Sequence, residues 1–567
     1  MNVLRTRLLL SVVLGLVVAG ASVSPVAAEP SSSASSSAAS STSPSAALRQ
    51  PSRRSLAPAI DDSLTTAITS APARFSTDRS PTFTYQAPDR SGVRFRCALQ
   101  LGAATPTEQD CVAGLTTSGG VATATMQYAD LARSKEAYQF SVLAYVPAGG
   151  GTAEVDGPVA SYDWHLYALF APDSYRPGTG ATFNNPLGDR AARRRNLRHA
   201  IRAIDSMPGY EQPATGSAPC PSTASAAPSR IRIAVFAMTD GPFADSLVAA
   251  SRRCVSVQLL MHNLLTRSDD PAFRRLQDAV GSNRGARSFA WRCHFGCRGS
   301  GVLHTKMYLF DTQQAGATAA IQATVMFGSS NMTENAVRHQ WNDLYTVAGH
   351  PRLYGDYAGY FDLMKLDNGF HRNPGRYGAA AGYPTVFWPV GANQSDPEKD
   401  VLRSLRCAHA TGGTGVNGHT AVYINMHAWH GLRGLDFVRL ARGLYARGCY
   451  VRVLYGFMPH RVYHRLTVGT GSRMSVRRTV FSRDGVYASV YSHFKAIIVT
   501  GHIGTDTSAR AVWTGSNNFT SGGTHHDEMM VRIHGAVAYH EYRDWFHVIT
   551  VRKSSPVWAR FRAPPPA

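Results

Sequence analysis

The sequence predicts an α/β protein with two similar halves, preceded by a small all-β domain. Three observations predict this fold class. A β-α-β pattern occurs once in each half of the α/β region, and each copy is followed by the same two short motifs. Upstream of both copies, short strands of alternating polarity are separated by turns rich in Gly and Pro, as in small β-sandwiches.

Residues 1–28 have the pattern of an export signal. Arg5 and Arg7 form a short positive region, Leu8–Val18 is mostly apolar, and small residues precede Glu29. A membrane anchor is the alternative, but this apolar core is short for a span of ~20 residues. We therefore expect a cleaved signal peptide and a secreted, extracellular protein.

Residues 29–60 are dominated by Ser, Ala and Pro and are predicted to be a linker. Residues 61–163 contain the alternating strands. This region resembles bacterial immunoglobulin-like modules, in which Phe-x-Cys-x-Leu is followed by a second Cys about fourteen residues later. Cys97 and Cys111 fit that place. The resemblance implies a Cys97–Cys111 disulfide and a spacer or adhesive role.

The α/β region divides into residues 164–395 and 396–567. Each part has a buried strand, a helical pattern and a second strand, over residues 231–238, 243–253 and 254–260 in the first part and 421–426, 435–447 and 449–454 in the second. This repetition predicts two pseudo-symmetric α/β/α lobes.

The chain has eight cysteines, and an even number in an exported protein favours disulfides. In each half one Cys precedes the first strand and another opens the second strand. This symmetry favours the pairs Cys220–Cys254 and Cys407–Cys449, although sequence alone leaves connectivity open. Cys293 and Cys297 are expected to form the remaining pair. A zinc site is the alternative there, but no second ligand pair with zinc-like spacing accompanies them.

The repeated motifs are His-x-Lys and Gly-Ser-x-Asn. The first half has His304 and Lys306, followed by Gly-Ser-Ser-Asn ending at Asn331; the second has His493 and Lys495, followed by Gly-Ser-Asn-Asn ending at Asn518. On a strand, residues two apart share a face, so each His should project together with its Lys. The two copies, brought face to face, would surround one cavity with imidazole, ammonium and amide groups.

Such a cavity suits a phosphodiester. Cations and amide donors stabilise charge on a pentacoordinate phosphorus. One His can attack phosphorus, and the other can protonate the leaving oxygen and then activate water. No metal and no cofactor is expected, because the lysines supply the positive charge.

The doubled His-x-Lys with Gly-Ser-x-Asn resembles the phospholipase D superfamily over roughly residues 165–567. The resemblance implies two lobes with the site at their seam and a covalent phosphohistidine. It favours His304 as nucleophile and His493 as acid, although the sequence itself does not decide between them. Asp311 completes the family pattern in the first motif, whereas Thr500 replaces the acid in the second.

Further residues are expected to support the site. Asp343 and Glu528 follow the two Asn residues at matching places and could orient a His through its other ring nitrogen. The serines of the Gly-Ser-x-Asn motifs complete the set, which is Ser329, Ser330 and Ser516.

The substrate class stays open between two chemistries. The formal net charge is +21, or +19 without the two arginines of the signal peptide, and it favours anionic partners such as phospholipid surfaces or nucleic acid. Hydrolysis of phospholipids is the first expectation, with peripheral contact to an anionic membrane surface. A metal-independent secreted nuclease and a non-catalytic binding protein are the alternatives. The Arg-rich run 190–199 is either a solvated helix face or a patch for phosphates.

Overall fold

The computed structural model describes residues 59–149, 151–211, 219–263, 270–313, 321–368, 377–378, 382–391, 394–481 and 490–553. The predicted signal peptide and all but the last two residues of the predicted linker lie outside these ranges. Within the described residues, no helix combines the length and apolar character that crossing a membrane requires.

The N-terminal part is all β, as predicted. Its four-stranded sheet has the order β2-β4-β8-β7, and its larger sheet includes β5, β9 and β11. The strands are β1 Ala59–Ile60, β2 Ala67–Ser70, β3 Phe75–Ser76, β4 Thr82–Pro88, β5 Arg94–Leu101, β6 Thr107–Asp110, β7 Thr116–Ser118, β8 Val121–Gln127, β9 Tyr138–Val146, β10 Val155–Asp156 and β11 Ala160–Leu166. Phe83 on one sheet and Phe140 on the other stack in a shared apolar core. The immunoglobulin-like character of this part stays a prediction.

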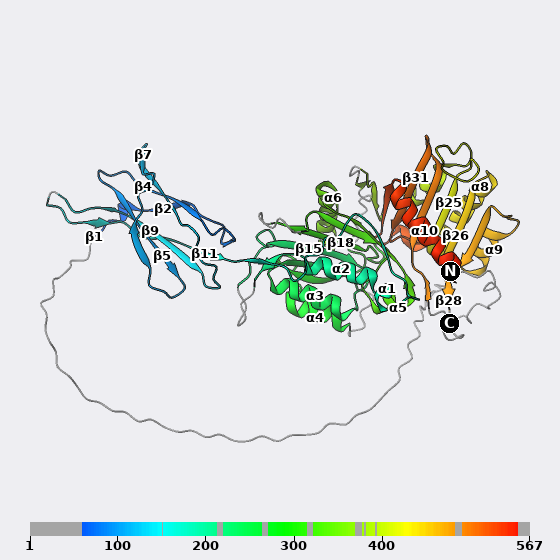
Figure 1. The fold of residues 1–567 in the computed structure, drawn as a ribbon, viewed down its shortest axis with the longest axis horizontal. Helices are drawn as coiled ribbons and strands as arrows, with labels where there is room; N and C mark the ends of the chain where they lie inside the picture. The colour runs from blue at the N-terminus through cyan, green and yellow to red at the C-terminus, as the bar shows by residue number, and fades with distance from the viewer. Residues whose placement is uncertain are drawn as a thin grey trace, which may run out of the picture. The chain divides into compact units, whose positions relative to one another are not determined.

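The first lobe is a seven-stranded sheet of order β13-β21-β19-β18-β15-β16-β17. Its strands are β13 Gly180–Phe183, β15 Ser229–Val235, β16 Ser256–His262, β17 Phe289–Cys293, β18 Met307–Thr312, β19 Thr324–Gly328 and β21 Asp343–Val347. Helices α2 (Arg195–Asp205), α3 (Gly241–Arg252) and α4 (Pro271–Val280) cover one face of the sheet (Figure 1). The short β12 (Leu169–Phe170) and β14 (Gly209–Tyr210) pair with each other.

The second lobe has the sheet order β22-β23-β33-β31-β30-β25-β26-β27. Its strands are β22 Tyr377–Gly378, β23 Thr385–Phe387, β25 Ala421–His430, β26 Tyr450–Phe457, β27 Met474–Arg478, β30 Lys495–Ile503, β31 Asp506–Gly515 and β33 Met529–His534, with the short β24 (Leu405–Arg406) paired to β30 and β32 (Phe519–Thr520) paired to β25. Helices α8 (Gly431–Ala446) and α9 (His460–Thr467) cover its outer face, and α7 (Pro397–Arg403) packs beside α8.

The two sheets repeat each other strand for strand. From β13 to β17, each strand of the first lobe has a counterpart, in the same order, between β23 and β27 of the second. In both lobes the first two strands of the β-α-β unit are parallel, and the strand that follows the His-x-Lys motif runs antiparallel between them and the rest of the sheet. The predicted fold class, two pseudo-symmetric α/β lobes after an all-β part, is confirmed.

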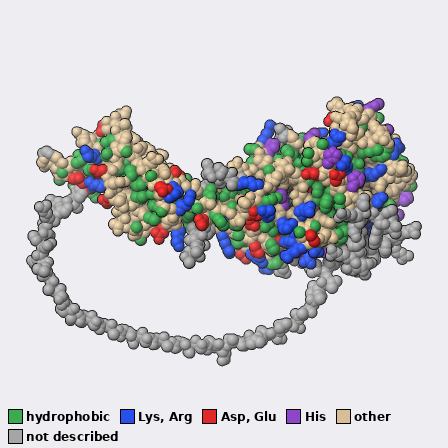
Figure 2. Space-filling model, viewed as in Figure 1, with side chains coloured by type: hydrophobic (Ala, Val, Ile, Leu, Met, Phe, Trp, Pro, Cys, Tyr) green, Lys and Arg blue, Asp and Glu red, His purple; other side chains and the backbone are tan. Residues whose placement is uncertain are grey.

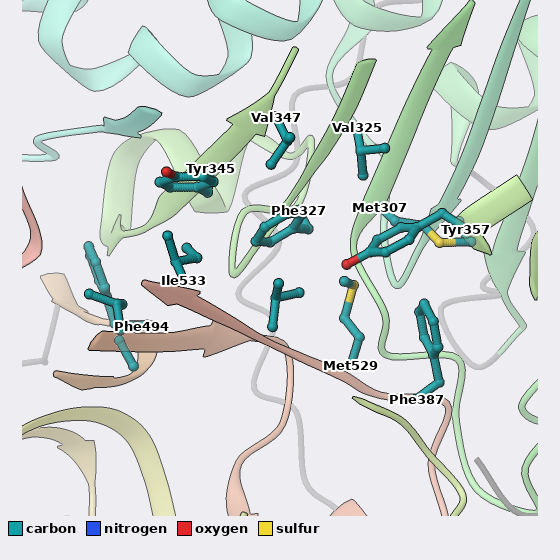
Figure 3. Close-up of a cluster of buried hydrophobic side chains, with 14 of the residues drawn as sticks. Met307, Val325, Phe327, Tyr345, Val347, Tyr357, Phe387, Phe494, Met529 and Ile533 are labelled. Atoms are coloured by element: carbon teal, nitrogen blue, oxygen red, sulfur yellow. The ribbon is translucent and has the colours of Figure 1, made fainter. Parts of the chain in front are cut away.

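The inner faces of both sheets share one apolar core. Phe327 and Tyr345 come from the first sheet, and Met529 and Ile533 come from the second (Figure 3). Helices α6 (Pro351–Met364) and α10 (Ala536–Lys553) complete this core. The lobes are therefore held together by buried apolar surface, which is the dominant favourable term in folding.

Four disulfides join Cys97–Cys111, Cys220–Cys254, Cys293–Cys297 and Cys407–Cys449. These are the pairs that the sequence predicts. The second and fourth hold equivalent places, each fastening the start of the second strand of a β-α-β unit. The Cys293–Cys297 bond also excludes the zinc alternative, because a disulfide leaves no thiolate for the metal.

The shared core predicts a large cost for truncation at its centre. Phe327 is fully buried between the sheets, so we expect Phe327→Ala to lower the free energy of unfolding by about 3–5 kcal/mol. Urea unfolding followed by tryptophan fluorescence measures this. The control is Phe170→Ala, whose side chain is half exposed and whose removal should change stability by less than about 0.5 kcal/mol. Equal effects of the two changes would contradict a core shared by the lobes.

Candidate active site

The two His-x-Lys segments lie where the lobes meet. The prediction that each His stands on a strand is wrong, because β18 begins only at Met307 and β30 only at Lys495. The preceding residues instead bind the opposite lobe. The His304 backbone N–H donates to the Asp527 carbonyl at 2.9 Å, and the His493 N–H donates to the Trp341 carbonyl at 3.0 Å. These hydrogen bonds to the opposite lobe replace the strand-to-strand hydrogen bonds of a sheet. They fix the backbone position from which each imidazole projects.

His304 is oriented by Glu528 of the second lobe. Its ring Nδ1 lies 2.9 Å from both carboxylate oxygens of Glu528, which is buried. Burial lowers the pKa of His304 to about 3 despite this partner. Burial alone would raise the pKa of Glu528, but the His304 ring, its hydrogen bond and Lys306 bring it well below the usual range. The pair is therefore a carboxylate accepting Nδ1–H from a neutral imidazole, whose Nε2 keeps its lone pair.

His493 is oriented by an amide instead. Its Nδ1 lies 2.8 Å from Oδ1 of Asn342 in the first lobe, and its Nε2 lies 3.0 Å from Nζ of Lys495. Because the Asn oxygen is an acceptor, Nδ1 carries the proton and Nε2 accepts from the lysine. The His427 ring packs 4.8 Å from the His493 ring. Burial and the charge of Lys495 bring the pKa of His493 well below its usual value.

Asn342 and Glu528 hold equivalent positions. Gly328 pairs with Leu344 in the first sheet and Gly515 pairs with Met530 in the second, so the register aligns Asn342 with Glu528. The prediction that Asp343 matches Glu528 is therefore wrong by one residue. The loops between motif and strand differ in length, and only the strand pairing reveals which residue faces the imidazole.

Asp343 has a different task. Its carboxylate accepts from the backbone N–H of Ser329 at 3.1 Å and from the hydroxyls of Ser329 at 2.6 Å, Tyr542 at 2.8 Å and Thr514. Tyr542 lies on α10 and Thr514 on β31, both in the second lobe. Asp343 thus ties three segments of the two lobes together and has no hydrogen bond to either His.

The two lysines share the buried space with both imidazoles. Lys306 donates to the His304 carbonyl and Lys495 to the His493 carbonyl, so each ammonium turns back toward its own motif. Burial lowers the pKa of Lys306 to about 7 and brings that of Lys495 well below its usual value. The charge of Lys306 also lowers the pKa of His493 in the opposite lobe. The two motifs therefore form one electrostatic unit.

The Gly-Ser-x-Asn motifs border the same unit. Ser516 donates to Glu528 and Ser329 donates to Asp343, so each first serine fixes a carboxylate. The Ser330 carbonyl accepts from the Tyr308 hydroxyl at 2.8 Å. The side-chain oxygens of Asn331 and Asn518 are buried and accept no hydrogen bond from the described residues.

Asp311 lies away from the two imidazoles. It pairs with Arg230 at the far end of β18, four residues and about 13 Å along the strand from Met307. Its carboxylate accepts from the backbone N–H of Ala323 at 3.0 Å. Thr500 does similar work in the second lobe, where its hydroxyl accepts from the Gly415 N–H. Asp311 and Thr500 therefore hold loop backbone in place and form no hydrogen bond with either imidazole.

Sequence reasoning missed three contributors, which are Asn342, Phe236 and Arg433. Asn342 lies next to Asp343, and in the sequence the acid is the more obvious hydrogen-bond partner for a His. Phe236 and His427 occupy equivalent positions, and their rings pack against His304 and His493. Arg433, almost fully buried, pairs with Asp396 and Glu398 and donates to the Asn518 carbonyl, which holds that motif in place. Alignment of the two halves strand by strand could have revealed the first pair of rings, but nothing in the sequence marks Arg433.

The arrangement can act on a phosphorus oxyanion. It offers one imidazole with a free Nε2 beside a carboxylate, a second imidazole in contact with an ammonium, and two buried amides. Within the described residues, no group of three or more His, Cys, Asp or Glu side chains could hold a metal ion.

Comparison with known proteins finds a family similarity within the first lobe. Residues 222–365 match the family described as "Cardiolipin synthase, PLD-like domain". Among solved structures, a polyphosphate kinase from Porphyromonas gingivalis aligns with 9% identity and a TM-score of 0.43, over 83% of this chain and 76% of that one. Nuc, a phospholipase D family member from Salmonella typhimurium, aligns with 17% identity and a TM-score of 0.20, over 33% of this chain and 93% of that one. No curated protein matches in sequence.

The different tasks of Asp343 and Glu528 can be separated by mutation. We expect Asp343→Asn to lower the free energy of unfolding by roughly 1.5–3 kcal/mol, because a buried carboxylate that accepts four hydrogen bonds is lost. The His304 imidazole signals in NMR spectra should stay unchanged. Glu528→Gln should instead shift those signals. A shift of the His304 signals in Asp343→Asn as large as that in Glu528→Gln would contradict the assignment.

Proposed function

We propose that the chain belongs to the phospholipase D superfamily and is a secreted phosphodiesterase that hydrolyses phospholipids through a covalent phosphohistidine. The observation that carries the proposal is the exchange of partners between lobes. Each imidazole is oriented through Nδ1 by a residue of the opposite lobe, Glu528 for His304 and Asn342 for His493. A site so built uses both motifs on one substrate.

The difference between the two partners supports His304 as the nucleophile. A carboxylate on Nδ1 makes Nε2 more electron-rich and stabilises the positive charge that the ring acquires on bonding to phosphorus. Asn342 gives His493 no such charge. The Lys495 ammonium, 3.0 Å from Nε2 of His493, instead supplies that nitrogen with a proton.

The steps follow from these roles. Nε2 of His304 attacks phosphorus, and the bond from phosphorus to the leaving alcohol oxygen breaks. That oxygen takes a proton that passes from the Lys495 ammonium through Nε2 of His493, which leaves Lys495 as a neutral amine. A water molecule then attacks phosphorus and gives a proton to Nε2 of His493, which passes it back to Lys495, while the bond to His304 breaks and a phosphate monoester is released. Lys306 and the amide N–H groups of Asn331 and Asn518 stabilise the oxyanion throughout.

Exposed apolar side chains support a lipid substrate. Leu432 lies two residues after β25, Phe457 is the last residue of β26 and pairs with Ala428, and their side chains are 78% and 50% exposed. Phe295 is 53% exposed, and its carbonyl lies 3.2 Å from Nδ1 of His262, whose ring stacks on Phe236 beside His304. Apolar groups next to a phosphodiester site suit acyl chains better than nucleic-acid bases.

The test is a parallel assay of the mature protein in EDTA. We expect choline release from phosphatidylcholine vesicles, no cleavage of single- or double-stranded DNA, and losses of at least about 1000-fold in both His304→Ala and His493→Ala, because the two motifs serve one site. Protein denatured during turnover should carry phosphorus at His304.

Four outcomes would overturn parts of this proposal. DNA cleavage without choline release would make the protein a nuclease. Full turnover by either His variant would refute the shared site, and label at His493 would reverse the two roles. The absence of any phosphodiesterase activity would favour a binding protein that keeps the fold.

The buried lysine predicts an alkaline limit on activity. Lys306, whose pKa burial lowers to about 7, carries its charge below that pH and loses it above. We therefore expect kcat/KM to fall as the pH rises through about 7, since the neutral amine stabilises the oxyanion less. Initial rates measured across this pH range test the expected fall on the alkaline side of the profile. A rate that stays constant up to pH ~9 would show that Lys306 remains charged.

A further inference from the structure

A second concentration of positive charge lies outside the catalytic centre. Figure 2 shows Lys and Arg side chains gathered over α1 (Arg190–Arg193) and α5 (Glu334–His339). A basin of about 620 Å³ opens there. Five arginines, one glutamate and three apolar residues line it, namely Arg190, Arg193, Arg194, Arg198, Arg338, Glu334, Ile201, Pro242 and Val337. None of the six residues assigned to catalysis is among them.

The charge in the basin is not balanced. Five arginines against one glutamate leave a formal charge of +4. Glu334 is already bound twice, by Arg194 at 2.8 Å and Arg338 at 2.9 Å. Arg194 is also bound at 2.7 Å by Asp240, which is buried behind it. The acids Asp240 and Glu334 therefore hold Arg194 and Arg338 in place.

The other cations have no counter-charge. Arg190, Arg193 and Arg198 form no ion pair with any described residue. Arg190, Arg194 and Arg198 are spaced four residues apart across the junction of α1 and α2, where backbone hydrogen bonds from Arg194 to Arg190 and from Arg198 to Arg194 keep a helical turn, so like charges lie side by side and repel. A bound anion would remove this repulsion.

We propose that this basin binds a compact phosphate-bearing group with two or more negative charges. Guanidinium groups match phosphate oxygens with paired hydrogen bonds, and several converge here on one hollow. The volume exceeds that of a single phosphate, and the concave shape favours a group that enters it over a flat surface. The site is separate from the catalytic centre and does not depend on the proposed function.

The basin borders the segment that shapes the active site. Glu334 follows Asn331 by three residues, and α5 runs directly into β20 (Gln340–Trp341), whose Trp341 carbonyl accepts from His493. Arg338 on α5 thus precedes by three residues Trp341, whose carbonyl binds the His493 backbone.

The test is titration calorimetry with inorganic pyrophosphate. The protein is compared with Arg190→Ala/Arg198→Ala, which removes two exposed arginines of the basin, and with Arg461→Ala/Arg465→Ala, a control that removes two exposed arginines four residues apart on α9. We expect the basin variant to bind roughly tenfold or more weakly and the control to bind like the unaltered protein. Binding at the catalytic centre is common to all three proteins and cancels in the comparison.

Vesicles then identify the source of the phosphate. Protein that binds phosphatidylcholine vesicles only when they contain phosphatidic acid, and that pyrophosphate displaces, would assign the basin to a lipid headgroup. Pyrophosphate binding without vesicle binding would assign it to a free phosphate compound. Equal loss in both double variants, or no loss in the basin variant, would overturn the proposal. Basin-dependent binding of a single-stranded oligonucleotide that pyrophosphate does not displace would also overturn it.

Discussion

The apolar core between the two sheets is the constraint on which the rest of the structure depends. Residues from both lobes fill it, including Phe327 and Met529. The active site lies at the same junction and contains groups that are costly to bury, since two lysines, a glutamate and an aspartate lie there almost without contact to water. The favourable burial in the core offsets that cost. The hydrogen bonds of Asp343 to Tyr542 and Thr514 add a polar link across the same junction.

Much of this arrangement could be predicted from the sequence because it is repeated. Each half contains a β-α-β unit, a His-x-Lys motif and an equivalent pair of cysteines. Each copy therefore predicts the same lobe structure independently of the other. The fold class and the pairing of the cysteines followed from that redundancy. Hydrophobic periodicity was sufficient for β15, β16, β25 and β26, which are buried and continuous in sequence.

Predictions that depended on strand register or on contacts between lobes were less successful. The apolar residues that follow His304 predict a strand that includes it, yet its backbone N–H donates to the Asp527 carbonyl of the other lobe. The sequence favours Asp343 over Asn342 as the residue that orients a His, because acids are the usual hydrogen-bond partners of His. A one-residue difference in loop length hid the true alignment, and Arg433 reaches Asn518 only through the folded chain.

The pair Glu528 and Asn342 has a consequence for how a substrate enters. Two lobes of matching topology would form a cavity that accepts a phosphodiester in either of two opposite orientations, and the leaving group could point toward either His. A carboxylate at one of two equivalent positions and an amide at the other remove that ambiguity. Under the roles that we propose, one side of the site would serve bond formation and the other proton transfer, so a nearly symmetric frame would perform a reaction with a fixed direction.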